Sequence, residues 1–105
     1  MNENEFIKNV ADEIQKNCTP LNIILVSNKI NTSGDVVSFK LAIIVDDNTA
    51  SISELECQLY MKVDSEIPYD LVLYKQSEWD SLRTEIGTFA WKIYNTGVYI
   101  YGQRI

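Results

Sequence analysis

The chain has 105 residues and a mass of 12.0 kDa, which is the size of one small domain, and we expect a single domain over residues 1–105. Its 15 acidic and 9 basic residues give a net charge of −6, which repels nucleic-acid phosphates and anionic lipids, so we expect no direct nucleic-acid or membrane partner. The absence of histidine excludes imidazole metal ligands and every Ser–His or Cys–His nucleophile pair. The acidic N-terminus and the lack of a long apolar run predict a cytoplasmic protein without a signal peptide.

The first half of the chain predicts one helix and two strands. Apolar residues at helical spacing predict an amphipathic helix over residues 3–17, which ends before Pro20. The short apolar run at 21–26 predicts a buried strand. The polar, turn-rich residues 27–35 predict a loop. Residues 36–46 then predict a long strand, because their character alternates with a period of two.

This long strand has two different faces. One face is wholly apolar and consists of Val37, Phe39, Leu41, Ile43 and Val45. The other face begins polar and consists of Val36, Ser38, Lys40, Ala42, Ile44 and Asp46. We therefore expect the first face to be covered along its length, and the second to be open near Ser38 and Lys40.

The second half predicts two further strands and helices around them. Ser51 and Glu54 have capping-box spacing, which predicts a helix from there to residue 63. Residues 68–74 predict a strand in which Asp70 is the one charged residue. Ser77 begins a second capping pattern, which predicts a helix to about residue 86, a further helix over 89–94 and a last strand over 98–101. The expected class is α/β (α+β), with a small mixed sheet of about four strands flanked by three to four helices.

This pattern resembles the minimal nucleotidyltransferase domain of the polymerase-beta type over nearly the whole chain. In that family one strand ends in Gly-Ser, a loop with basic residues follows, and a second strand opens with Ser-Asp-x-Asp. Ser27 stands where that serine would be, and Ser38 and Lys40 stand where the two aspartates would be. Asp70 matches the family's third carboxylate. The resemblance implies a nucleotidyltransferase-like fold.

The family's chemistry depends on carboxylates that this chain lacks. Family members hold two divalent metal ions with three carboxylates, which neutralise charge on the entering and leaving oxygens. Of these positions only Asp70 keeps its acid, and an ammonium at Lys40 repels a dication. We therefore expect no catalytic residues, no bound metal and no cofactor, and a remnant site of Ser27, Ser38, Lys40 and Asp70. We expect Lys40 and Asp70 to form a partly buried ion pair; the alternative is that Lys40 reaches water and Asp70 is solvated.

Two functions follow from the resemblance. The first is a domain that has lost metal-dependent catalysis and acts as a binding or protein-interaction module, with a small helical protein as the partner that the family suggests. The alternative is a divergent nucleotidyltransferase, which moves a nucleoside monophosphate from a triphosphate to a hydroxyl of a protein or small molecule. In that case Mg²⁺ would be held by Asp70 and Asp35, and Ser27 and Lys29 would bind the nucleotide.

Overall fold

The computed structural model describes residues 4–104, and these form one mixed four-stranded sheet with four helices. In chain order the elements are α1 (Glu5–Asn17), β1 (Asn22–Ile30), β2 (Val36–Val45), α2 (Ile52–Lys62), β3 (Tyr69–Lys75), α3 (Gln76–Leu82), α4 (Phe89–Thr96) and β4 (Val98–Tyr101). The strand order is β3-β2-β1-β4; β1 is antiparallel to both of its neighbours, and β3 is parallel to β2 because α2 crosses over between them. The expected mixed α/β architecture is confirmed.

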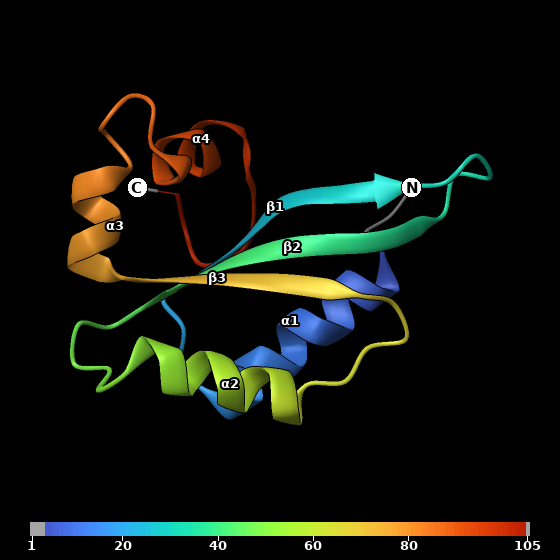
Figure 1. Ribbon diagram of the computed structural model, residues 1–105, viewed down its shortest axis with the longest axis horizontal. Coiled ribbons are helices and arrows are strands. Elements are labelled where there is room, and N and C mark those ends of the chain that lie inside the picture. The colour runs from blue at the N-terminus through green and yellow to red at the C-terminus, as the bar shows by residue number, and fades with distance from the viewer. Residues whose placement is uncertain (1–3, 105) are drawn as a thin grey trace.

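The helices cover the two faces of the sheet in pairs (Figure 1), and each pair closes a separate core. The larger core lies under α1 and α2; its β2 members are Phe39, Leu41, Ile43 and Val45. The smaller core lies under α3 and α4 and includes Ala42 and Ile44 of the same strand. The predicted two-faced alternation of this strand is therefore confirmed from Phe39 onward.

At its beginning, β2 departs from the predicted alternation. Lys29 pairs with Ser38, but the next residue, Ile30, pairs with Val36, so β2 carries one extra residue at Val37. A bulge of this kind reverses which face the preceding residues occupy. Val36 packs against the core under α1 and α2, whereas Val37 is 40% exposed. The prediction that Val37 belongs to the covered face, and Val36 to the other, was wrong.

The predicted loop over residues 27–35 was also wrong in its first half. β1 continues to Ile30, and only residues 31–35 form a turn. The side-chain oxygen of Asn31 accepts hydrogen bonds from the backbone N–H groups of Ser33 and Asp35, and Gly34 has a φ of +88° that favours glycine. Pairing with β2 holds residues 27–30 extended, although they lack the apolar pattern of a covered strand.

The structure confirms one predicted helix start and contradicts another. The Ser51 hydroxyl accepts a hydrogen bond from the Glu54 N–H, which confirms this predicted start of α2. By contrast, α3 begins at Gln76 and ends at Leu82, and the Ser77 N–H donates to Asp47 Oδ1 instead of opening a capping box. The side chain of Asn4 caps α1; residue 3, where this helix was predicted to begin, lies outside the described residues.

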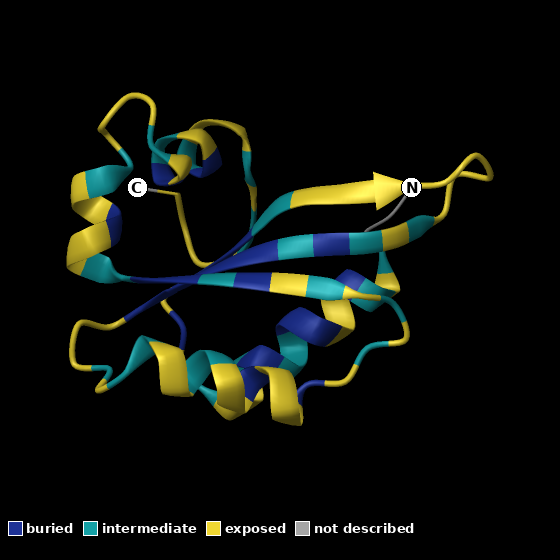
Figure 2. Cartoon of the chain, in the orientation of Figure 1, coloured by how far each residue is buried: buried dark blue, intermediate teal, exposed yellow. Residues whose placement is uncertain are grey.

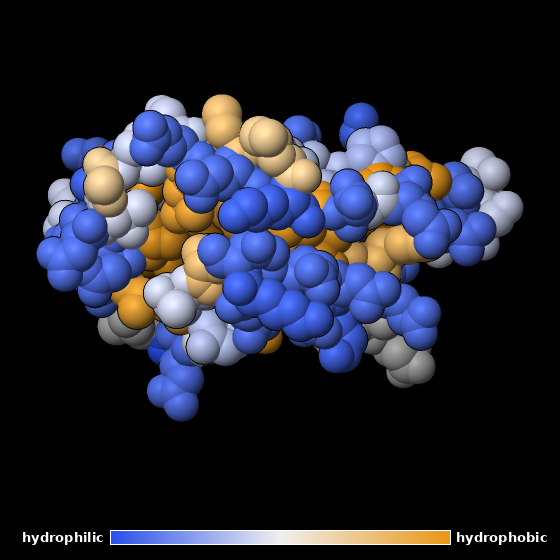
Figure 3. Space-filling model, turned by 90° about the horizontal axis from the view of Figure 1, so that it is seen from below, coloured by the Kyte–Doolittle hydropathy of each residue, from blue (hydrophilic) through white to orange (hydrophobic). Residues whose placement is uncertain are grey.

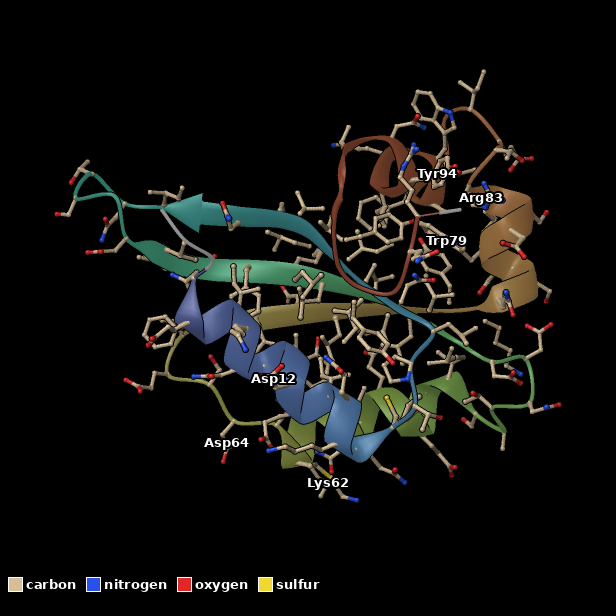
Figure 4. The ribbon with its side chains drawn as sticks, turned by 180° about the vertical axis from the view of Figure 1, so that it is seen from behind. Asp12, Lys62, Asp64, Trp79, Arg83 and Tyr94 are labelled. Carbon is tan, nitrogen blue, oxygen red and sulfur yellow. The ribbon has the colours of Figure 1, made fainter. Side chains whose placement is uncertain are left out.

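Aromatic side chains join α3 and α4 to the sheet. Trp79 of α3 is 2% exposed, and its ring centroid lies 5.5 Å from that of Tyr74 and 6.3 Å from that of Tyr94. The guanidinium of Arg83 stacks 4.8 Å from the Tyr94 ring centroid, and Figure 4 shows these side chains together at the α3–α4 end. This cluster anchors both helices at one end of the sheet and leaves its other end uncovered on that face.

Seen from the side of α1 and α2, the surface is mostly hydrophilic, with apolar side chains visible between belts of polar ones (Figure 3). Within residues 4–104, no helix combines the length and the apolar character needed to cross a membrane.

A tyrosine of α2 binds one backbone N–H on the outer edge of β3. The Tyr60 hydroxyl accepts a hydrogen bond of 2.7 Å from the Leu71 N–H, and the Tyr69 hydroxyl donates one of 2.6 Å to the Val63 carbonyl. The rings of Phe39, Tyr69 and Tyr60 form a continuous stack. Desolvation by burial is the main cause that raises the pKa of Tyr60 and of Tyr69, so both phenols are protonated at neutral pH. Edge strands are usually protected in some such way.

We expect Tyr60→Phe to lower the free energy of unfolding by about 1 kcal/mol, because the Leu71 N–H loses its acceptor while the ring stack is kept. Urea unfolding followed by circular dichroism measures the change. Tyr101→Phe is the matched control, since Tyr101 is 41% exposed and its hydroxyl takes part in none of the side-chain hydrogen bonds found among residues 4–104. Equal stability of the two variants would contradict the role of Tyr60.

Candidate functional site

The strand register places three of the predicted site residues in one row across the sheet. Ser27 of β1 pairs with Lys40 of β2, and Lys40 pairs with Asp70 of β3. Lys29 pairs with Ser38 one step further along the same two strands. Because directly paired residues point to the same face, all five side chains lie on one face of the sheet. This is the face that α3 and α4 cover further along, where Ala42 lies in the core.

The row lines an open hollow of about 230 Å³. Its lining residues are Ser27, Asn28, Lys29, Ser38, Phe39, Lys40 and Asp70. Ser27, Lys29 and Asp70 are exposed, and Ser38 and Lys40 are half-buried. Figure 2 shows the uncovered end of β1 as exposed. The hollow therefore presents two ammonium groups, two hydroxyls and one carboxylate to solvent. These are the residues of the predicted remnant site together with Lys29.

The expected ion pair between Lys40 and Asp70 is not formed, so that prediction was wrong. The ammonium of Lys40 lies instead 5.5 Å from the centroid of the Phe89 ring, at the start of α4. The ion pairs found among residues 4–104 all lie elsewhere, and each joins residues within a single helix or its end. Asp70 is exposed, so water solvates its carboxylate and an ion pair would add little.

Asp35 does not join the hollow. It lies at the end of the turn between β1 and β2, and its backbone N–H is bound to the side chain of Asn31. The lining therefore offers one carboxylate, at Asp70, beside the ammonium groups of Lys29 and Lys40. Mg²⁺ requires several oxygen ligands, and charged ammonium groups donate none and repel a dication, so these residues do not fit the metal pair that the resemblance implies. In the part of the chain that the structure describes, no three acidic or thiol side chains gather as a metal site.

Two larger hollows lie on the α1–α2 side and share the segment 64–66. One of about 270 Å³ is lined by this segment with Phe6, Asn9 and Val10. The other, of about 480 Å³, is lined by the same segment with neighbouring residues of α2 and β3. Their charged groups are Asp64 and Glu66, with no cation beside them, so neither hollow combines groups of opposite charge as the sheet hollow does.

Phe89 is the site residue that sequence reasoning missed. It is 42% exposed, it contacts Lys40, and the hydroxyl of Thr88 caps the helix that it begins. Phe89 and Lys40 are far apart in the chain, and their contact depends on how α4 packs over the sheet. No local pattern indicates such a contact. Asn28 was also missed, because residues 27–35 read as a loop.

Comparison of the chain with protein-family models, with curated proteins and with solved structures finds no match. A function for this site therefore rests on its residues and their geometry.

Proposed function

We propose that this chain is a nucleotidyltransferase-like domain that does not transfer nucleotides and acts as a binding module through the hollow at the open end of its sheet. The observation that supports this most is the row Ser27–Lys40–Asp70. Three neighbouring strands bring these side chains to one open face, at the positions that the resemblance assigns to catalysis. The row therefore keeps the placement of a nucleotidyltransferase site with different chemistry.

The charge in the middle of the row opposes metal binding. Lys40 lies between Ser27 and Asp70, so a dication bound at Asp70 would have an ammonium on the adjacent strand. The two unit charges of the ion double its repulsion by that ammonium, and the repulsion grows as the site is desolvated. Asp70 also supplies the only carboxylate among the lining residues, whereas such an ion takes several oxygen ligands.

The alternative, a divergent nucleotidyltransferase, needs a second carboxylate near Asp70. Asp35 was the candidate, and its place in the turn outside the hollow counts against it. For this reason we favour the non-catalytic function.

The chemistry of the hollow indicates the partner surface it fits. Lys29 and Lys40 are suited to a carboxylate, and the half-exposed ring of Phe89 is suited to an apolar side chain. We propose a small helical protein as the partner, on the basis of the family resemblance, with acidic and apolar side chains at its contact.

We expect the native chain to show no Mg²⁺-dependent binding of ATP in isothermal titration calorimetry, and the double variant Ser38→Asp/Lys40→Asp to bind Mg²⁺. The variant places three carboxylates, at positions 38, 40 and 70, on the face of the sheet that lines the hollow, as an oxygen-ligand site requires. Ser53→Asp/Lys62→Asp on α2 is the matched control, since it makes the same change in charge at exposed positions and should bind no Mg²⁺.

Two outcomes would contradict the proposal. Micromolar binding of ATP by the native chain that requires Mg²⁺ would favour the alternative enzyme. Failure of a folded Ser38→Asp/Lys40→Asp variant to bind Mg²⁺ would show that these positions do not correspond to the carboxylates of the family. Circular dichroism establishes whether each variant is folded.

A further inference from the structure

One edge of β1 is open over half of the strand. The last pairing with β4 joins Leu25 to Val98, whereas β1 continues to Ile30. Residues 27–30 pair with β2 on one side, and Val26 is an extra residue at a shift of the β1–β2 register. On the other side, residues 26–30 have no strand among residues 4–104. Residues 27–30 are also exposed, as Figure 2 shows. Open edges present unpaired backbone groups that readily bind a further strand.

Asn28 lies at the centre of this open segment, and its backbone groups point outward. The N–H of Phe39 donates to the Pro68 carbonyl, so the backbone of Phe39 faces β3 and not β1. Phe39 and its partner Asn28 are therefore a non-hydrogen-bonded pair of the β1–β2 ladder. In an antiparallel ladder the residues of such a pair direct their N–H and C=O groups away from each other. The N–H and C=O of Asn28 are thus directed to the open edge.

We propose that two copies of this chain associate by antiparallel pairing of these open edges, around a two-fold axis at Asn28. Each Asn28 then exchanges two backbone hydrogen bonds with the partner's Asn28, and the two sheets become one continuous sheet. The turn beginning at Asn31 bounds the open segment at one end and β4 bounds it at the other. The register centred on Asn28 places residues 26–30 of the two copies side by side.

The side chains of this segment fit a second copy. In this register Ser27 lies opposite the partner's Lys29, so a hydroxyl faces an ammonium and no like charges are directly opposed. Ile30, which is 59% exposed, comes next to the partner's Val26 and loses apolar surface to it. The open segment itself carries one charged residue, Lys29, and none of the acidic residues that give the chain its net charge of −6.

The test is sedimentation equilibrium from micromolar to millimolar protein at physiological salt, with variants at the two-fold axis. We expect a concentration-dependent dimer. Asn28→Asp and Asn28→Lys should each weaken dimerisation about tenfold, because each places a like charge directly opposite its own copy. An equimolar mixture of the two variants should regain the native affinity through opposite charges. A native chain that stays monomeric throughout, or variants that dimerise like it, would overturn the proposal.

A second pair of variants tests the backbone contact. Asn28→Pro removes an N–H that points outward and leaves the β1–β2 hydrogen bonds intact, so a folded but monomeric protein is expected. Asn28→Ala keeps the N–H and should dimerise like the native chain. Thermal unfolding establishes that both variants fold. If Asn28→Pro prevents folding, the hydrogen-exchange rate of the Asn28 amide in the native chain tests the edge pairing instead. Slower exchange at higher protein concentration supports the pairing, and an exchange rate independent of concentration overturns it.

Discussion

Trp79→Ala is expected to lower the free energy of unfolding by about 3–5 kcal/mol, the largest effect of any substitution considered for this protein. Trp79 is 2% exposed and lies between the Tyr74 and Tyr94 rings, so its removal leaves a cavity where α3 and α4 meet the sheet. A loss of this size is a large fraction of the stability of a typical small domain.

Trp91→Ala is the matched control for this prediction. Trp91 lies on α4 and is only half-buried, so the same chemical change removes less buried surface, and we expect a loss of about 1 kcal/mol. Urea unfolding should be followed by far-ultraviolet circular dichroism, because each variant lacks one of the two tryptophans that fluorescence would report. If both variants lose the same stability, Trp79 does not anchor the two helices as its contacts indicate.

Gly97→Ala is expected to cost about 3 kcal/mol, because there is no room for a methyl group between α4 and β4. A Cβ at Gly97 would lie 2.5 Å from Ile24 Cγ2, 2.7 Å from the Ile93 carbonyl oxygen and 3.3 Å from the Leu25 carbonyl oxygen. The two carbonyl oxygens belong to the backbone and cannot rotate away, so the α4–β4 connection must shift.

Gly87→Ala separates this steric effect from backbone strain. Gly87 has a φ of +97°, which L-residues adopt at a cost of about 1 kcal/mol, but a Cβ there meets no atom within 4 Å. We therefore expect Gly87→Ala to be the milder of the two changes in thermal and urea unfolding. A Gly97→Ala protein more stable than Gly87→Ala would show that the α4–β4 connection adapts to the methyl group.

Much of the fold could be predicted from periodicity. The continuous apolar run from Leu41 to Val45 indicates a part of β2 that is covered on both faces, and helical spacing of apolar residues indicates α1. Such patterns arise because each element must bury one side or both, which imposes a period of 3.6 or two on its apolar residues. The order of elements followed from these patterns, whereas the mixed sheet was expected from the family resemblance.

The errors fall where burial imposes no such pattern. Residues 27–30 are exposed, so their strand conformation left no apolar alternation and they were predicted as a loop. The bulge at Val37 is a property of the β1–β2 register, and the capping pattern at Ser77 was overridden because Gln76 directly continues β3 into α3. In each case pairing or packing with another part of the chain outweighed a local preference.

The candidate site also has features that the sequence predicts and features that depend on the tertiary structure. The sequence alone determines the residue types at positions 27, 38, 40 and 70. It also shows that Ser38 and Lys40 stand where the family resemblance would place two carboxylates. That these side chains line one hollow, that Lys40 contacts Phe89 and not Asp70, and that Asn28 directs its backbone to an open edge all depend on the assembled sheet and helices. Local periodicity indicates which face of an element is buried. Contacts between residues that are distant in the chain depend on strand register and helix placement, and these are determined by the fold as a whole.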